Sequence, residues 1–301
     1  MKRKINKKYY LLIVVVLIFL MSVLILVPTI KKDNIKLTQL SPQGPNQMMG
    51  YILKTKNNKL IVIDGGTIDD TQNLMKYINE NNNKVDYWFI THAHNDHAGA
   101  FTEIVNNTEV EIGKIYISLN DYEWYERNEP NREEFSKLLI DTVNSEKIKK
   151  VVESPKLNQL IQIDEIKVEI LGIRNPEITE NPGNEQSMVI KFDTGKTKLL
   201  ILGDTGTKSS QKLLKNQKNK LKSDIVQMAH HGQAGATEEL YKEIEPRVCL
   251  WPTPEWLWNN DSGAGINSGN WKTFETKKWM KQINVKRNYI AKDGDITINI
   301  D

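Results

Sequence analysis

The sequence predicts an α/β fold in which two β-sheets pack face to face with helices on the outside, preceded by one transmembrane helix. Apolar strand patterns precede helical patterns in two successive runs, which favours a sandwich over a doubly wound sheet. Roughly 265 residues remain after the first 36, a length that suits one large domain. An apolar run near the N-terminus predicts the membrane segment.

That run extends from residue 9 to residue 27, and Ser22 is its only clearly polar side chain. At about 1.5 Å per residue it nearly spans a hydrocarbon core of about 30 Å. Five Lys and Arg residues precede it, which predicts a cytoplasmic N-terminus. A cleaved signal peptide is the alternative, but the run ends without the small residues of a cleavage site.

The chain is therefore expected to divide into four parts and to cross the cell membrane once. Residues 1–8 form a cytoplasmic basic tail, 9–30 the membrane anchor, 31–47 a linker and 48–301 an extracellular domain. The membrane is the expected partner of residues 9–30, and the sequence indicates no obligate protein partner.

Charge is distributed unevenly between the N-terminal segment and the domain. The first 36 residues contain eight Lys or Arg and one acidic residue, Asp33, which leaves 33 basic against 37 acidic residues, a net charge of −4. A mildly acidic domain is not typical of proteins that hold long nucleic acid unaided. The single cysteine, Cys249, excludes an intrachain disulfide and a cysteine-based zinc cluster.

Hydrophobic periodicity predicts the elements in chain order. The first run comprises a hairpin at 51–53 and 60–63, a helix at 71–81, an apolar strand at 87–90 and a helix at 132–143. The second run comprises strands within 161–170, a hairpin at 188–192 and 199–202, a helix at 211–221, a strand at 225–228, a helix at 237–244, a strand at 248–251, a helix at 273–280 and a closing strand pair at 288–291 and 295–300.

All five histidines fall in two short clusters: His92, His94 and His97, and the pair His230 and His231. The first cluster follows the strand at 87–90, so we expect a loop at the end of a strand. Alternate residues His92 and His94 can converge on one ion, while Asp96 and His97 turn toward a second. Imidazole and carboxylate are ligands that suit zinc or a similar divalent ion. The alternative is a polar loop whose hydrogen bonds are satisfied internally.

The string His-x-His-x-Asp-His after an apolar strand resembles the signature of the metallo-β-lactamase superfamily, and the similarity covers roughly residues 48–300. The resemblance implies a four-layer αββα sandwich with two divalent metal ions at one edge, zinc being expected and manganese or iron the alternatives. It implies these metal ligands: His92, His94, Asp96, His97, Asp204 and His230.

Other roles follow from the same resemblance. Asp204 bridges the two ions, Asp96 also acts as general base, and His231 donates a proton to the leaving group. Which member of the histidine pair binds the metal stays open at this point. Asp64, at the end of an early strand, orients a ligand rather than binding metal itself.

The chain departs from the family pattern at one metal-binding position. Most members supply a third histidine to the first metal, but no histidine occurs here between His97 and His230, and Asn184 stands at the corresponding place. The stretch 184–187 (Asn-Glu-Gln-Ser), together with 229–232 (Ala-His-His-Gly), resembles the hydrolase domain of the bacterial DNA-uptake channel protein ComEC and its stand-alone relatives. The first metal is then held by His92, His94 and Asp204 alone, or with the help of Asn184.

The predicted function is a membrane-anchored, extracellular hydrolase that cleaves a phosphodiester in nucleic acid or a nucleotide, through a water activated by two metals. A lysine run that begins at Lys208 either steers phosphate or is a solvated helix face. Trp256 and Trp258 belong to a Gly-rich loop of tryptophans that forms either a stacking wall for a base or part of the core.

Three other functions compete with this one. The same metals can hydrolyse a carboxylic ester, lactone or amide. An iron-dependent oxidoreductase is disfavoured, because the electron-transfer members of the family carry Glu where His94 stands. A non-catalytic binding module is disfavoured by the intact first cluster, which decayed members commonly lose.

Overall fold

The structure is a computed structural model that describes residues 34–301. The predicted cytoplasmic tail (1–8) and membrane anchor (9–30) lie outside these residues. Among residues 34–301, no helix combines the length and the apolar character needed to cross a bilayer.

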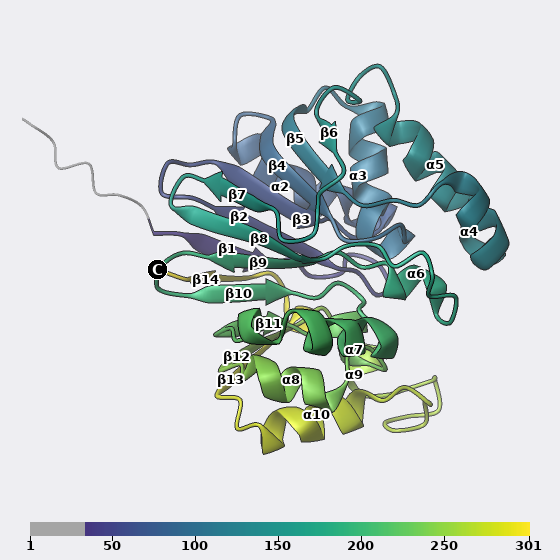
Figure 1. Cartoon of the computed structure of the whole chain (residues 1–301), viewed down its shortest axis with the longest axis vertical. Helices are drawn as coiled ribbons and strands as arrows, with labels where there is room; N and C mark the ends of the chain where they lie inside the picture. The colour runs from purple at the N-terminus through teal and green to yellow at the C-terminus, as the bar shows by residue number, and fades with distance from the viewer. Residues whose placement is uncertain (1–33) are drawn as a thin grey trace, which may run out of the picture. The chain divides into compact units, whose positions relative to one another are not determined.

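Two seven-stranded sheets form the centre of the domain (Figure 1). The first contains, in spatial order, β14 (Ile296–Asn299), β1 (Lys36–Gln39), β2 (Gly50–Lys54), β3 (Leu60–Asp64), β4 (Lys84–Ile90), β5 (Glu111–Ile117) and β6 (Val152–Glu153). The second contains β13 (Arg287–Ile290), β12 (Val248–Trp251), β11 (Ile225–Gln227), β10 (Lys198–Ile201), β9 (Val189–Asp193), β8 (Ile166–Gly172) and β7 (Leu160–Ile163). Strands β3 to β6 are parallel, and so are β10 to β13.

Helices cover the outer face of each sheet. On the first sheet lie α2 (Thr71–Glu80), α3 (Asn95–Asn107), α4 (Tyr122–Asn128) and α5 (Glu133–Val143); on the second lie α7 (Thr207–Asn216), α8 (Glu238–Ile244) and α10 (Thr273–Gln282). The loops contain α6 (Pro182–Glu185), α9 (Glu255–Trp258) and the 3-10 turns η1 (Ile68–Asp70), η2 (Pro130–Arg132), η3 (Lys218–Lys220), η4 (Ala229–Gly232) and η5 (Ala291–Asp293). One apolar cluster lies between the sheets and one under each helical layer, which confirms the predicted αββα order.

Strand β4 is buried on both faces, as its unbroken apolar run predicts. Trp88 points to the helices and packs edge-on against Phe101 of α3, with ring centroids 5.0 Å apart. Phe89 points into the core between the sheets and stacks on Tyr116 at 5.0 Å. Because aromatic side chains anchor both faces, the residues that follow Ile90 start from a rigid position.

Two expectations about the ends of the domain were wrong. The predicted linker (31–47) contains β1, whose Leu37 is buried and which pairs with both β2 and β14, so the compact unit begins at residue 34 rather than 48. The strand lies next to polar residues and is only four residues long, so its alternation is too short to recognise. The closing strands do not pair with each other, since β13 and β14 belong to different sheets.

Two helices also differ from the prediction. Helix α7 begins at Thr207 and ends at Asn216, whereas the sequence indicated 211–221. The expected loop after β4 is present but covers only residues 91–94, because α3 begins at Asn95 inside the histidine cluster, with His94 as its N-cap residue. Asp96 thus lies in the first turn, where the helix dipole favours a negative charge.

Candidate metal centre

Four strand ends supply the polar residues of the candidate site. Asp64 ends β3, the first histidine cluster follows β4, Asp204 follows β10, and the histidine pair follows β11. The carboxyl ends of neighbouring parallel strands lie at one edge of a sheet, so each sheet brings two of these segments together. The predicted convergence of residues more than 100 positions apart is therefore a consequence of the strand order.

The structure forms two groups of possible metal ligands that share one carboxylate. The groups are Asp96, His97, Asp204 and His231, and His92, His94 and Asp204; within each, the ligand atoms lie within 4.8 Å of one another. Asp204 Oδ1 lies 3.2 Å from His97 Nε2, and Asp204 Oδ2 lies 3.9 Å from His92 Nε2. Asp204 thus stands between the two groups, as expected of a bridging residue.

Unpaired buried atoms show that the residues fit metal ions. Five nitrogen and oxygen atoms of the groups are buried and make no hydrogen bond of acceptable geometry among the described residues, although two of them, His97 Nε2 and Asp204 Oδ1, lie 3.2 Å apart. The five atoms are His92 Nε2, Asp96 Oδ1, His97 Nε2, Asp204 Oδ1 and His231 Nε2. Buried polar atoms without partners destabilise a protein by about 1–3 kcal/mol each, so clusters of them are rare unless they bind something. A set of imidazole nitrogens and carboxylate oxygens suits zinc, manganese or iron.

The charges of the groups also favour cations. Burial lowers the pKa of His92 well below its ordinary value, which leaves the neutral imidazole that a metal requires. Burial raises the pKa of Asp204, but the adjacent imidazoles of His97 and His231 outweigh burial and hold this pKa well below its usual range. For His97, burial lowers the pKa, and the carboxylates of Asp204 and Asp64 more than reverse that effect and raise it. The carboxylate of Asp204 therefore stays ionised although it is buried.

Asp64 takes the orienting position expected of it. It is fully buried, and its Oδ2 lies 2.7 Å from His97 Nδ1. The backbone N–H and the hydroxyl of Thr91 each donate a hydrogen bond of 2.7 Å to the same carboxylate. Since Nδ1 of His97 is held in this way, its Nε2 faces Asp204 and the second group.

The structure reverses the roles that the sequence predicted for His230 and His231. His231, not His230, joins the second group: its Nε2 lies 3.2 Å from Asp96 Oδ2 and its Nδ1 lies 2.9 Å from the carbonyl oxygen of Pro252. His230 lies outside both groups, with its Nε2 3.3 Å from Asn184 Nδ2. Both histidines have left-handed backbones, with φ of 50° and 55°, so the chain turns sharply and the two side chains diverge.

Three residues near the groups had no signal in the sequence. Gln47 Nε2 donates a hydrogen bond of 3.1 Å to Asp96 Oδ2, and Gln233 Nε2 donates one of 3.1 Å to Gln47 Oε1. Glu129 Oε1 lies 3.0 Å from His94 Nε2. The predicted helper Asn184 donates a hydrogen bond to Asn181, and its buried Oδ1 has no partner among residues 34–301.

The lysine run is ion-paired, and only its first part lies on α7. Five of its lysines contact a glutamate, in the pairs Lys208–Glu180, Lys212–Glu177, Lys218–Glu243, Lys220–Glu169 and Lys222–Glu245. This agrees with the solvated alternative, because the paired charges largely cancel. Lys208 nevertheless lines a surface hollow of about 540 Å³ together with His230.

The two predicted stacking tryptophans differ in their surroundings. Trp258 packs edge-on against Trp251 at 5.2 Å, and the ammonium of Lys277 lies 3.5 Å from its ring centre, so Trp258 has a packing role. The ring centroids of Trp256 and Trp271 lie 4.9 Å apart. Trp256 Nε1 donates a hydrogen bond to the carbonyl oxygen of Pro45, two residues before Gln47. The Trp256–Trp271 pair is therefore tied to the segment that contacts Asp96.

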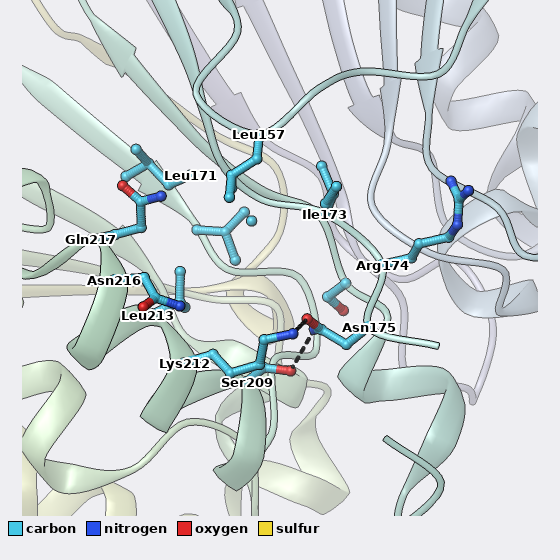
Figure 2. A pocket seen from close by; sticks show the side chains of 13 residues that line it. Leu157, Leu171, Ile173, Arg174, Asn175, Ser209, Lys212, Leu213, Asn216 and Gln217 are labelled. Carbon is cyan, nitrogen blue, oxygen red and sulfur yellow. Dashed lines mark hydrogen bonds between the residues drawn. The ribbon is translucent and has the colours of Figure 1, made fainter. Parts of the chain in front are cut away.

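A separate cavity of about 210 Å³ lies between the end of β8 and α7 (Figure 2). Apolar side chains surround most of it, while Asn175, Ser209 and Lys212 join in hydrogen bonds at one end and Arg174 points away. None of the possible metal ligands lines it. One of its lining residues, Ser187, contacts them, with its Oγ 3.4 Å from His92 Nδ1.

Comparison with known proteins agrees with this geometry. The model of the Metallo-beta-lactamase superfamily matches residues 46–250. ComE operon protein 3 of Bacillus subtilis (strain 168) is 23% identical over 171 residues, which are 56% of this chain and 20% of that protein. The chain thus spans about a fifth of the length of this curated relative.

Solved structures share the fold at low sequence identity. The metallo-beta-lactamase fold protein YhfI from Bacillus subtilis has a TM-score of 0.55 and 13% identity, covering 88% of this chain and 100% of that one. Unliganded yeast PDE1 has a TM-score of 0.55 and 12% identity, covering 89% and 100%. The diiron β-hydroxylase CmlA from Streptomyces venezuelae has a TM-score of 0.52 and 9% identity, covering 89% and 54%.

Proposed function

Since this chain belongs to the metallo-β-lactamase superfamily, we propose that this metal-dependent hydrolase cleaves phosphodiesters in extracellular nucleic acid or nucleotides. The observation that carries the proposal is the pair of ligand groups joined by Asp204. Two divalent ions held side by side supply, when bound, the positive charge that stabilises the attacking and leaving oxygens of an in-line displacement.

The chain's own residues position the reactants. Asp204 links the two groups, and Asp64 fixes the ring of His97. Asp96, held by Gln47 and His231, is placed to accept a proton from the attacking water. We assign to His230, which lies outside both groups, the contact with the leaving group that the sequence predicted for His231.

Three features support a nucleic acid or nucleotide as the substrate. The chain resembles the hydrolase domain of a DNA-uptake protein, and its similarity to ComE operon protein 3 agrees with this. The Trp256–Trp271 pair, on which a base can stack, is hydrogen-bonded to the segment whose Gln47 contacts Asp96. Lys208 and His230 line one hollow, where both can contact a substrate, although Glu180 and Glu185 line it as well.

Hydrolysis of a carboxylic ester, lactone or amide is the second candidate. It is favoured by the glutamates that pair with five lysines of the run, because they leave no dense cationic surface there. The net charge of −4 beyond residue 36 points the same way.

A side-by-side assay separates the two candidates. We expect the metal-loaded full-length protein to hydrolyse bis-p-nitrophenyl phosphate and single-stranded DNA with a higher kcat/KM than p-nitrophenyl acetate. The reason is that two metal ions, held by the two ligand groups that share Asp204, would stabilise the negative charge of a phosphoryl group in the transition state. Release of p-nitrophenol and loss of full-length DNA are the measurements. Efficient cleavage of the acetate without cleavage of either phosphodiester would establish the second candidate instead.

We also propose that residues 9–30 anchor the protein in the cell membrane with the domain outside. The proposal rests on the apolar run and the five cationic residues before it. Protease added to intact cells should degrade the domain from residue 34 onward, while an N-terminal tag stays intact until the cells are lysed. A domain that resists protease until lysis would reverse the orientation.

A further inference from the structure

The two ligand groups are unequal. The second contains four side chains, Asp96, His97, Asp204 and His231, whereas the first contains only three, His92, His94 and Asp204. One fewer ligand leaves an ion more weakly held and its ligands more dependent on being oriented correctly. The first group therefore needs a compensating feature that the second does not.

Glu129 provides an unusual contact to this weaker group. It follows α4, and its side chain is only 8% exposed, although a carboxylate is rarely buried without a charged or metal partner. Its Oε1 lies 3.0 Å from His94 Nε2. Its Oε2 is buried and has no hydrogen-bond partner among residues 34–301. Glu129 is not itself a member of the three-residue group, so it acts on that group through His94.

The backbone of α6 closes over this pair of side chains. A Cβ added to Gly183 would lie 2.2 Å from His94 Nε2 and 2.3 Å from each carboxylate oxygen of Glu129. Contacts this short would force the ends of the two side chains to shift, so the Glu129–His94 contact as it stands requires glycine at this position. The Glu129–His94 contact is thus enclosed by a close approach of the main chain and shielded from water.

The contact between Glu129 and His94 determines which ring nitrogen of His94 can bind a metal ion. A neutral histidine carries one N–H and one lone pair, and the hydrogen bond made by one nitrogen decides which nitrogen binds metal. When Nε2–H of His94 donates to Glu129, the lone pair remains on Nδ1. The carboxylate of Glu129 also makes the imidazole more basic, so its lone pair binds a metal ion more strongly.

We propose that Glu129 is a positioning residue of the first metal group, which holds His94 in the metal-binding tautomer and offsets the missing third histidine. The inference rests on the metal site of the proposed function and is independent of which substrate is cleaved. It assigns a role to a residue 35 positions beyond His94 that no sequence motif marks.

Calorimetric titration of the metal-free, full-length protein with zinc tests the role. Wild type should bind two ions with two distinct affinities. Glu129→Ala should weaken one of them by about 10–100-fold, the range typical of lost partners of a metal ligand, and leave the other unchanged. Glu129→Gln should lie between the two, because its amide oxygen still accepts the Nε2–H bond but carries no charge. Glu126→Gln, an exposed glutamate one turn earlier in α4, is the matched control and should behave as wild type.

Cobalt substitution adds a readout of coordination that does not depend on activity. The visible spectrum of the cobalt-loaded protein should change in Glu129→Ala for one of two bound ions only, and Glu129→Gln should restore part of it. The inference would be overturned if Glu129→Ala bound both zinc ions with the wild-type affinities and showed an unchanged cobalt spectrum. It would also be overturned if the affinities for both ions fell equally in the alanine and glutamine variants. If instead the metal results hold and no phosphodiester is cleaved, only the proposed substrate fails.

Discussion

Asp204→Asn is expected to lower kcat/KM by at least about a thousandfold on every substrate, because Asp204 is the only side chain common to both ligand groups. A thousandfold loss corresponds to about 4 kcal/mol of transition-state stabilisation, in the range of the several kcal/mol that a bound metal ion supplies. Asparagine keeps the shape of the side chain, and the hydrogen bond from the backbone N–H of residue 204 to Ser187 Oγ, 2.9 Å long, is unaffected. The fold should therefore persist.

Elemental analysis and kinetics together check this result. The wild-type protein should contain one to two zinc, manganese or iron ions per chain, and Asp204→Asn clearly fewer, with an unchanged circular dichroism spectrum. Asp141→Asn, an exposed aspartate on α5, serves as the control and should retain metal and activity. A variant at position 204 that keeps both ions and full turnover would show that the two groups do not act as one centre.

His231→Ala and His230→Ala are expected to have different effects, although the residues are neighbours. His231 lies in the second group and is fully buried, so its loss should reduce metal content and lower kcat by about a thousandfold. His230 lies outside both groups, so its loss should leave the metal content unchanged. If it assists the leaving group, kcat should fall by about 10²-fold with little change in KM.

Metal content separates the two variants most directly. Both proteins should be titrated with zinc in parallel, and kcat measured on the substrate identified by the side-by-side assay. Loss of metal in His230→Ala together with full retention in His231→Ala would restore the assignment made from the sequence. Equal loss in both would mean that the turn at η4, rather than either ring, maintains the second group.

The sequence alone was sufficient for the features that depend on local pattern. The apolar run of β4 and the spacing of His92, His94, Asp96 and His97 predicted both a buried strand and a pair of metal groups at its end. The order of strands and helices predicted the two sheets. These features are readable because periodicity and motif spacing lie within a few residues of each other along the chain.

Only the tertiary structure decided the features that depend on which distant segments meet. It placed His231 rather than His230 in the second group, since the direction of two adjacent side chains depends on a left-handed turn. It paired the lysine run with glutamates and put β13 and β14 in different sheets. It also brought Glu129 to His94 across 35 positions, and Gln233 to Gln47 across 186. Such contacts are set by how the two sheets and their loops pack, and local composition carries no record of that packing.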